Sequence, residues 1–174
     1  MRRLGVIMAL GALLGLLAGV VTATPALAGR RHGWELVQAK PFTVPASFCG
    51  FKIGVTFPVA KEYAKLLKAS DGSVITLVTG SLRATYTNLS TGKAITENES
   101  GPGKATTHPD GSVTVRSTGH NGVFLSPADA QRFGLPTVGV TAGPLTASFN
   151  ASGQLTSLSL HGGHVLVDVC AALS

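Results

Sequence analysis

Two histidines separated by two glycines are the first residues whose types and spacing suit chemistry, in this case metal binding. His161 and His164 flank Gly162-Gly163, and Asp168 follows four residues later. A protein metal centre needs at least three converging ligands, but His164 and Asp168 on one strand would lie about 13 Å apart. A glycine turn with polar neighbours explains the pattern better. We therefore predict no metal site and no cofactor.

Other short patterns point to turns rather than to catalysis. The stretch His108-Pro-Asp110 places an imidazole beside a carboxylate, as an acid–base pair requires, yet Pro-Asp-Gly is the usual chemistry of a turn. The stretch Gly101-Pro-Gly-Lys104 resembles a phosphate-binding loop but lacks the Gly-Lys-Ser/Thr ending that such loops use. No Gly-x-Ser-x-Gly motif marks a hydrolase nucleophile. The sequence nominates no catalytic residue and does not favour an enzyme.

The elements that must position these residues show the alternation typical of β-strands. From Cys49 to Val59, apolar residues occupy the odd positions and mostly small or polar residues the even ones. Similar alternation returns at 145–150 and at 165–169, and turn sequences separate such runs at short intervals. We predict an all-β fold, an antiparallel meander of about eight to ten strands that closes as a barrel or packs as a sandwich.

Two segments depart from the strand pattern. Residues 58–69 carry apolar side chains near helical spacing, so this segment is either a short helix or an irregular strand. Ser126-Pro-Ala-Asp129 has the residues of a helix start, and Gly134 would end that helix after two turns. We therefore predict one or two short helices beside the strands. The helix over 127–133 would cover one end of a barrel.

The N-terminus has the pattern of an export signal. Met1-Arg-Arg is a basic start, residues 4–21 form an uncharged apolar run, and Ala26-Leu-Ala28 offers a cleavage site. We predict a signal peptide over 1–28, a flexible leader over 29–41, a single β domain over 42–174, and secretion. The apolar run just reaches the length of a membrane span, so an uncleaved signal is the alternative and the only membrane contact predicted.

The only two cysteines stand near the two ends of the predicted domain. In the oxidising compartment that export implies, an even cysteine count usually indicates a bridge. We predict a disulfide between Cys49 and Cys170. Such a bridge requires Cα atoms within about 7 Å, so the first and last strands of the domain must lie close together.

Four stretches rich in turn residues carry a resemblance to known sequences. They are Tyr86-Thr-Asn-Leu-Ser-Thr-Gly-Lys93, Glu99-Ser-Gly-Pro-Gly103, His108-Pro-Asp-Gly111 and Asp168-Val-Cys-Ala-Ala-Leu-Ser174. This set resembles a group of small exported proteins from actinobacteria, over most of residues 42–174. The group has no assigned activity, so the resemblance implies an origin and a β fold and supplies no functional residues.

Charge and composition narrow the function classes. The chain carries 14 lysines and arginines against 8 acids, but the basic residues are scattered in sequence, so we predict no nucleic-acid partner. We expect a binding or interaction module for a small apolar ligand or another extracellular protein, with His120 and Asn121 at the rim of an apolar interior. The alternatives are a barrel-type enzyme of the cyclase or hydrolase class, and a secreted protease inhibitor using an exposed loop over 120–136.

Overall fold

Residues 33–174 are described by the computed structural model, and the predicted signal peptide lies outside them. This part of the chain forms twelve strands and three short helices. The strands are β1 (Glu35–Val37), β2 (Phe42–Val44), β3 (Ile53–Lys68), β4 (Val74–Asn88), β5 (Ala94–Asn98), β6 (Gly103–Thr107), β7 (Val113–Ser117), β8 (His120–Phe124), β9 (Val138–Ala142), β10 (Leu145–Phe149), β11 (Leu155–Leu160) and β12 (His164–Asp168). The helices are α1 (Ala46–Cys49), α2 (Pro127–Phe133) and α3 (Val169–Leu173). A mostly antiparallel β fold with short helices is thereby confirmed.

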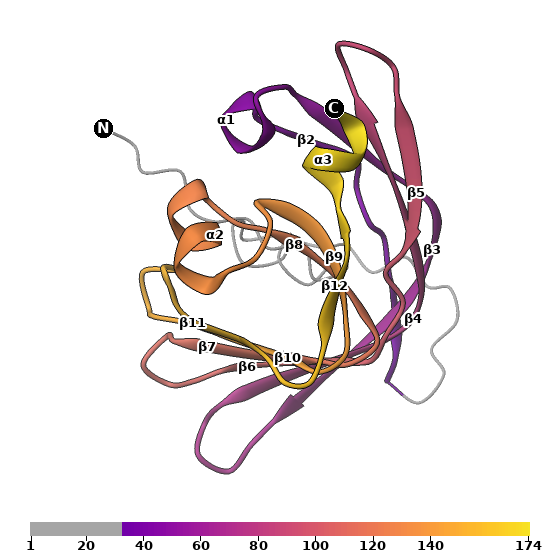
Figure 1. The fold of residues 1–174 in the computed structure, drawn as a ribbon. Helices are drawn as coiled ribbons and strands as arrows, with labels where there is room; N and C mark the ends of the chain where they lie inside the picture. Colours follow the sequence, from indigo (N-terminus) through magenta and orange to yellow (C-terminus); the bar gives the residue numbers. More distant parts are fainter. Residues whose placement is uncertain (1–32) are drawn as a thin grey trace.

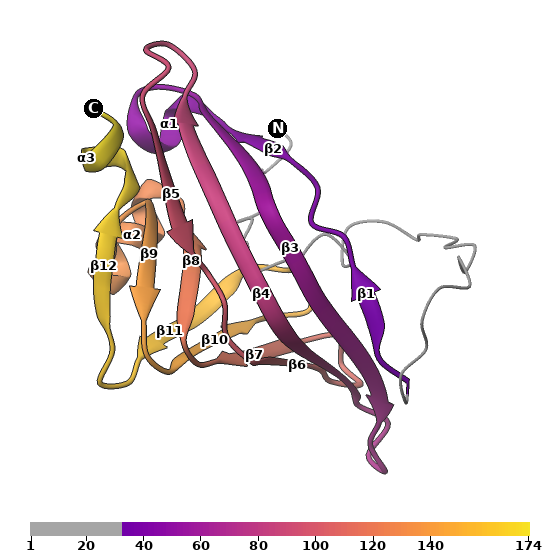
Figure 2. The same ribbon diagram turned by 90° about the vertical axis from the view of Figure 1, so that its right-hand side faces the viewer.

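Most strands belong to one antiparallel sheet of nine strands. Its hydrogen-bonded order is β1-β3-β4-β6-β7-β10-β11, with β2 also paired to β3 and β5 to β4. The long β3–β4 hairpin runs through both halves of this sheet, from Ile53 opposite Asn88 to Lys68 opposite Val74 (Figure 2). A second sheet has the order β12-β9-β8. Within residues 33–174 the strands do not close into a barrel.

Sharp corners between consecutive strands divide the fold into two halves. The chain turns between β5 and β6, β7 and β8, β9 and β10, and β11 and β12 over two to four residues each. The corners lie side by side, because the Gly143 amide donates to the Gly119 carbonyl at 2.8 Å. A Cβ on Gly143 would lie 2.7 Å from the Gly163 Cα, at a φ of 101° that favours glycine. Glycine therefore permits the close approach of neighbouring corners.

The apolar core consists of two clusters, one in each half of the fold. One cluster packs the lower strands β6, β7, β10 and β11 against α2, and the other packs β2–β4 against β9 and α3 (Figure 1). Strand β8 contributes a side chain to each cluster, because Val123 belongs to the first and its neighbour Phe124 to the second. Both faces of β8 are therefore buried, and the two clusters are separated by a single strand.

The two segments that depart from simple alternation have different outcomes. Ser126 caps α2 by accepting from the Asp129 amide at 3.1 Å, and Gly134 ends the helix with a φ of 66°, as predicted. Residues 58–68 belong to β3, so the strand interpretation holds there. The strand is irregular, because β3 advances three residues from Thr56 to Val59 while β4 advances two. None of the helices in residues 33–174 is long and apolar enough to cross a bilayer.

Candidate functional site

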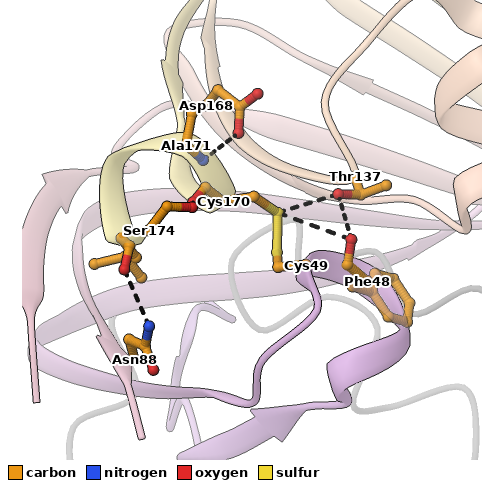
Figure 3. Close-up of a disulfide and its surroundings, with 9 residues drawn as sticks. Phe48, Cys49, Asn88, Thr137, Asp168, Cys170, Ala171 and Ser174 are labelled. Carbon is orange, nitrogen blue, oxygen red and sulfur yellow. Dashed lines mark hydrogen bonds between the residues drawn. A yellow bond between two sulfur atoms is a disulfide. The ribbon is translucent and has the colours of Figure 1, made fainter. Parts of the chain in front are cut away.

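The predicted disulfide between Cys49 and Cys170 is present and joins the two ends of the domain. The two Cα atoms lie 5.3 Å apart, and the bridge connects α1 to α3 (Figure 3). Polar contacts support it: the Thr137 hydroxyl donates to the Phe48 carbonyl at 2.9 Å, and the Asn88 amide donates to the Leu173 carbonyl at 3.0 Å. A disulfide is typical of an oxidising environment outside the cytoplasm. The bridge ties α1 to α3 across a sequence separation of 121 residues.

His120 and Asn121, the predicted rim residues, occupy the start of β8. The His120 Nδ1 atom lies 3.2 Å from the Asn98 carbonyl oxygen, and the half-buried ring faces the corner after β5. The Asn121 side chain is 4% exposed and donates to the Gly143 carbonyl at 3.2 Å. Both side chains thus contact backbone carbonyls at the corners. Ligand binding by this pair stays a prediction.

The histidine patterns lie in turns and at strand ends. His108 Nε2 lies 3.1 Å from the Thr114 hydroxyl across the β6–β7 turn, where Asp110 accepts from the Ser112 amide at 2.8 Å. His161 is exposed in the β11–β12 corner and His164 starts β12. Across residues 33–174, no group of three histidines, cysteines or acids is arranged to hold a metal ion.

Two buried glutamates form a cluster that the sequence did not indicate. Glu62 on β3 is 3% exposed and Glu99, at the corner after β5, is 5% exposed. The Tyr86 hydroxyl donates to Glu99 Oε1, whereas Glu62 Oε2 is buried without a hydrogen-bond partner among the described residues. Burial raises the pKa of Glu62 to about 7. Burial also raises the pKa of Glu99 to about 7, helped by the nearby charge of Glu62 and opposed by the Tyr86 hydrogen bond.

This acidic cluster has the group types of acid–base chemistry but lacks exposure. Carboxyl groups with pKa values near neutrality occur at many active sites. Here Tyr86 is fully buried and both carboxyl groups are at least nine-tenths covered, so a substrate cannot reach them without rearrangement of the core. The direct consequence of the cluster is a proton-dependent stability, because neutral carboxyl groups are easier to bury than charged ones.

A groove on the solvent-facing side of β4, β6, β7 and β10, on the face turned away from the core, is a better candidate for ligand binding than the buried acidic cluster. Its volume is about 380 Å³, and its lining among residues 33–174 includes two cations and no acid. The lining residues are Leu77, Pro102, Gly103, Lys104, Arg116, Ser117, Thr118, Pro144, Leu145 and Thr146. The strand register explains this composition, because four of them stand side by side on β4, β6, β7 and β10: Leu77, Lys104, Arg116 and Thr146.

The two cations of the groove are directly opposite each other on neighbouring strands. Lys104 is the register partner of Arg116, and both side chains are exposed. Like charges in this position destabilise a sheet, and the groove supplies no carboxylate to offset them. An anion placed between the ammonium and the guanidinium groups would relieve this repulsion and form charge-assisted hydrogen bonds. No sequence motif marks the pair, because the two residues are twelve positions apart and meet only through the register.

Comparisons with protein-family models, with curated proteins and with solved structures found no match for this chain. Among the features described, the cationic groove combines solvent access, concentrated charge and apolar surface.

Proposed function

We propose that the protein is an exported binding module that holds an anionic ligand in the groove around Lys104 and Arg116. The proposal depends on one observation: these two cations lie directly opposite each other on neighbouring strands, and none of the described residues that line the groove is acidic. Guanidinium and ammonium groups are the side chains that most often bind carboxylate, sulfate and phosphate oxygens. Export is supported by the N-terminal pattern together with the disulfide, which is typical of oxidising compartments.

The groove also favours a ligand with an apolar part. Leu77, Pro102 and Pro144 line it beside the cations, so an aliphatic or ring portion would cover apolar surface while the anionic group contacts the charges. The sequence predicted a small apolar ligand in the interior; in its place we propose an anionic, partly apolar ligand on the outer surface, supported by this lining. Two packed apolar clusters in the interior, together with the open strand order, support a filled, sandwich-like domain in preference to an interior carrier.

Soluble anions test the proposal directly. We expect octyl phosphate to bind more tightly than inorganic phosphate, because only the former covers the apolar lining, and octanol to bind more weakly than either. The variant Lys104→Ala/Arg116→Ala should lose at least about tenfold in affinity for both anions, since a hydrogen bond to a charged group contributes about 1.5–3 kcal/mol. Isothermal titration calorimetry at low ionic strength measures these affinities.

A matched variant separates a site from general charge. Lys40→Ala/Lys52→Ala removes two exposed cations outside the groove and leaves the net charge equal to that of the groove variant. This control should bind both anions as the wild type does. Equal losses in the two double variants would show nonspecific attraction and contradict the proposal.

An acid–base enzyme is the second candidate, favoured by the Glu62, Tyr86 and Glu99 cluster. Its group types suit proton transfer, but their burial weighs against it. The segment considered for a protease-inhibitor loop contains β8 and α2, which gives that alternative less support.

A further inference from the structure

Exposed apolar side chains concentrate at the free end of the β3–β4 hairpin and on the adjoining strand β1. In residues 33–174, seven large apolar side chains are exposed, and four of them lie here. They are Leu36 (51%), Tyr63 (43%), Leu66 (69%) and Leu67 (38%). Figure 2 shows this end of the hairpin projecting beyond the rest of the fold. Together with Lys61, Lys65 and Lys68, these four residues form what we call the hairpin patch.

The hairpin patch carries cationic and apolar side chains on both faces of β3. Lys61, Tyr63, Lys65 and Leu67 lie on the solvent-facing side of the sheet, and Leu66 and Lys68 lie on the side of Glu62, beyond the end of the core. Glu62 is the only acid between Lys61 and Lys68, and it points into the core. Lysines alone would be explained as protection of a strand edge, because within the described part of the chain residues 65–68 pair only with β4. The neighbouring Leu66 and Leu67 have the opposite effect, since exposed leucines on an edge promote association. The combination therefore indicates a surface that is covered in use.

The patch continues directly into the cationic groove. Lys65 is the register partner of Leu77, Leu77 of Lys104, and Lys104 of Arg116. With neighbouring strands about 4.8 Å apart, the row from Lys65 to Arg116 spans about 14 Å. The groove and the solvent-facing side of the patch (Lys61, Tyr63, Lys65 and Leu67) thus form one surface, and Leu66 lies on the other face of the same projecting hairpin.

We infer, on the basis of the proposed function, that the partner of this surface is a membrane bearing anionic phospholipids. The apolar side chains of the hairpin patch enter the interface while Lys104 and Arg116 hold a headgroup phosphate. Amphipathic surfaces with both lysines and apolar side chains bind anionic bilayers by combining charge attraction with apolar burial. Tyrosine suits this boundary because its ring is apolar and its hydroxyl is polar. An acidic polysaccharide would match the lysines but offers no apolar surface to Leu66 and Leu67.

Vesicle sedimentation with the full mature protein tests this inference. We expect binding to phosphatidylcholine vesicles containing 30% phosphatidylglycerol, little binding to phosphatidylcholine alone, and weakening at high salt. Trp34, the sole tryptophan, directly precedes β1 and should report binding by a blue shift of its fluorescence. The variant Leu66→Ser/Leu67→Ser should lower the partition coefficient at least tenfold, and Lys104→Ala/Arg116→Ala should lower it as well.

The edge strand β12 provides the control for the apolar residues. Val165→Ser/Leu166→Ser changes two exposed apolar side chains (38% and 41%) away from the patch and should bind vesicles like the wild type. Unchanged circular dichroism would show that each variant is folded. If Leu66→Ser/Leu67→Ser binds vesicles as well as the β12 variant does, the membrane inference is wrong. Octyl phosphate binding by Leu66→Ser/Leu67→Ser then shows whether the proposed anion site in the groove is correct even though the membrane inference is wrong. Tight binding of dextran sulfate that does not depend on Leu66 and Leu67 would identify a polysaccharide as the partner instead.

Discussion

Replacing the buried Glu62 by glutamine should change the free energy of unfolding in a way that depends strongly on pH. Burial raises the pKa of Glu62 from 4.5 to about 7 in the folded protein. Between these two values the folded protein therefore binds more protons than the unfolded chain, and the free energy of unfolding falls as the pH rises. A rise of this size corresponds to about 3 kcal/mol, which is lost by the time the pH exceeds 7.

The variant Glu62→Gln keeps the shape of the side chain and removes the titration. At pH 4, where Glu62 is mostly neutral in both states, the variant and the wild type should have similar stability. At pH 8.5 the variant should be more stable by up to about 3 kcal/mol, because glutamine is neutral without taking up a proton, whereas Glu62 must either bind a proton or be buried as a charge. Urea unfolding followed by circular dichroism at several pH values, with the disulfide intact, measures the difference.

The pH dependence of the difference distinguishes burial from ordinary mutational effects. Glu35→Gln makes the same chemical change at an exposed glutamate on β1 and should not reproduce the gain at alkaline pH. A stability difference for Glu62→Gln that is the same at pH 4 and pH 8.5 would refute the reasoning. Such a result would mean that the Glu62 carboxylate is solvated in the folded protein.

Three further substitutions probe other parts of the structure. Cys49→Ser opens a bridge with a sequence separation of 121 residues and should lower the free energy of unfolding by up to about 5 kcal/mol relative to the oxidised wild type in thermal unfolding. The reduced wild type should unfold as the variant does, and an oxidised wild type no more stable than the variant would contradict this. Gly143→Ala forces a Cβ against the neighbouring corner and should lower the free energy of unfolding by more than about 2 kcal/mol. Gly153→Ala, also at a positive φ but with open space around the added Cβ, should lower it by only about 1 kcal/mol. Equal losses would show that the close approach of the corners does not require a glycine at 143. Tyr86→Phe removes the hydrogen-bond donor to Glu99 and should lower the free energy of unfolding by about 1–3 kcal/mol at pH 8.5 and by less at pH 4. An equal loss at both pH values would argue against a hydrogen bond from Tyr86 to an ionised Glu99 carboxylate.

Local signals predicted the elements whose residues act over short distances. The cap at Ser126 and the glycine at 134 marked α2, and the alternation marked β3, although β3 begins at Ile53 and the predicted first strand residue Cys49 ends helix α1. The groove depends on the register of β6 and β7, which no local pattern encodes. Lys104 and Arg116 look scattered in sequence and become neighbours only when the two strands pair.

A single extra residue in β3 decides both the buried acid and the exposed hairpin patch. Before the irregularity, Ile53 and Val55 point into the core, and uninterrupted alternation would turn Lys61 and Lys65 inward. The extra residue shifts the phase, so that Glu62 points inward in place of the two lysines.

Either phase buries a charged residue type, but the consequences differ. A glutamate becomes neutral by taking up a proton near pH 7, whereas a lysine must lose one far below its usual pKa. The observed phase is the less costly of the two for the core. It also places Tyr63, Lys65 and Leu67 on the solvent-facing side of the sheet. Lys65 there stands in the same row of register partners as the groove cation Lys104. The buried glutamate and the exposed amphipathic surface are therefore two results of one register shift, and a chain that kept unbroken alternation would have neither.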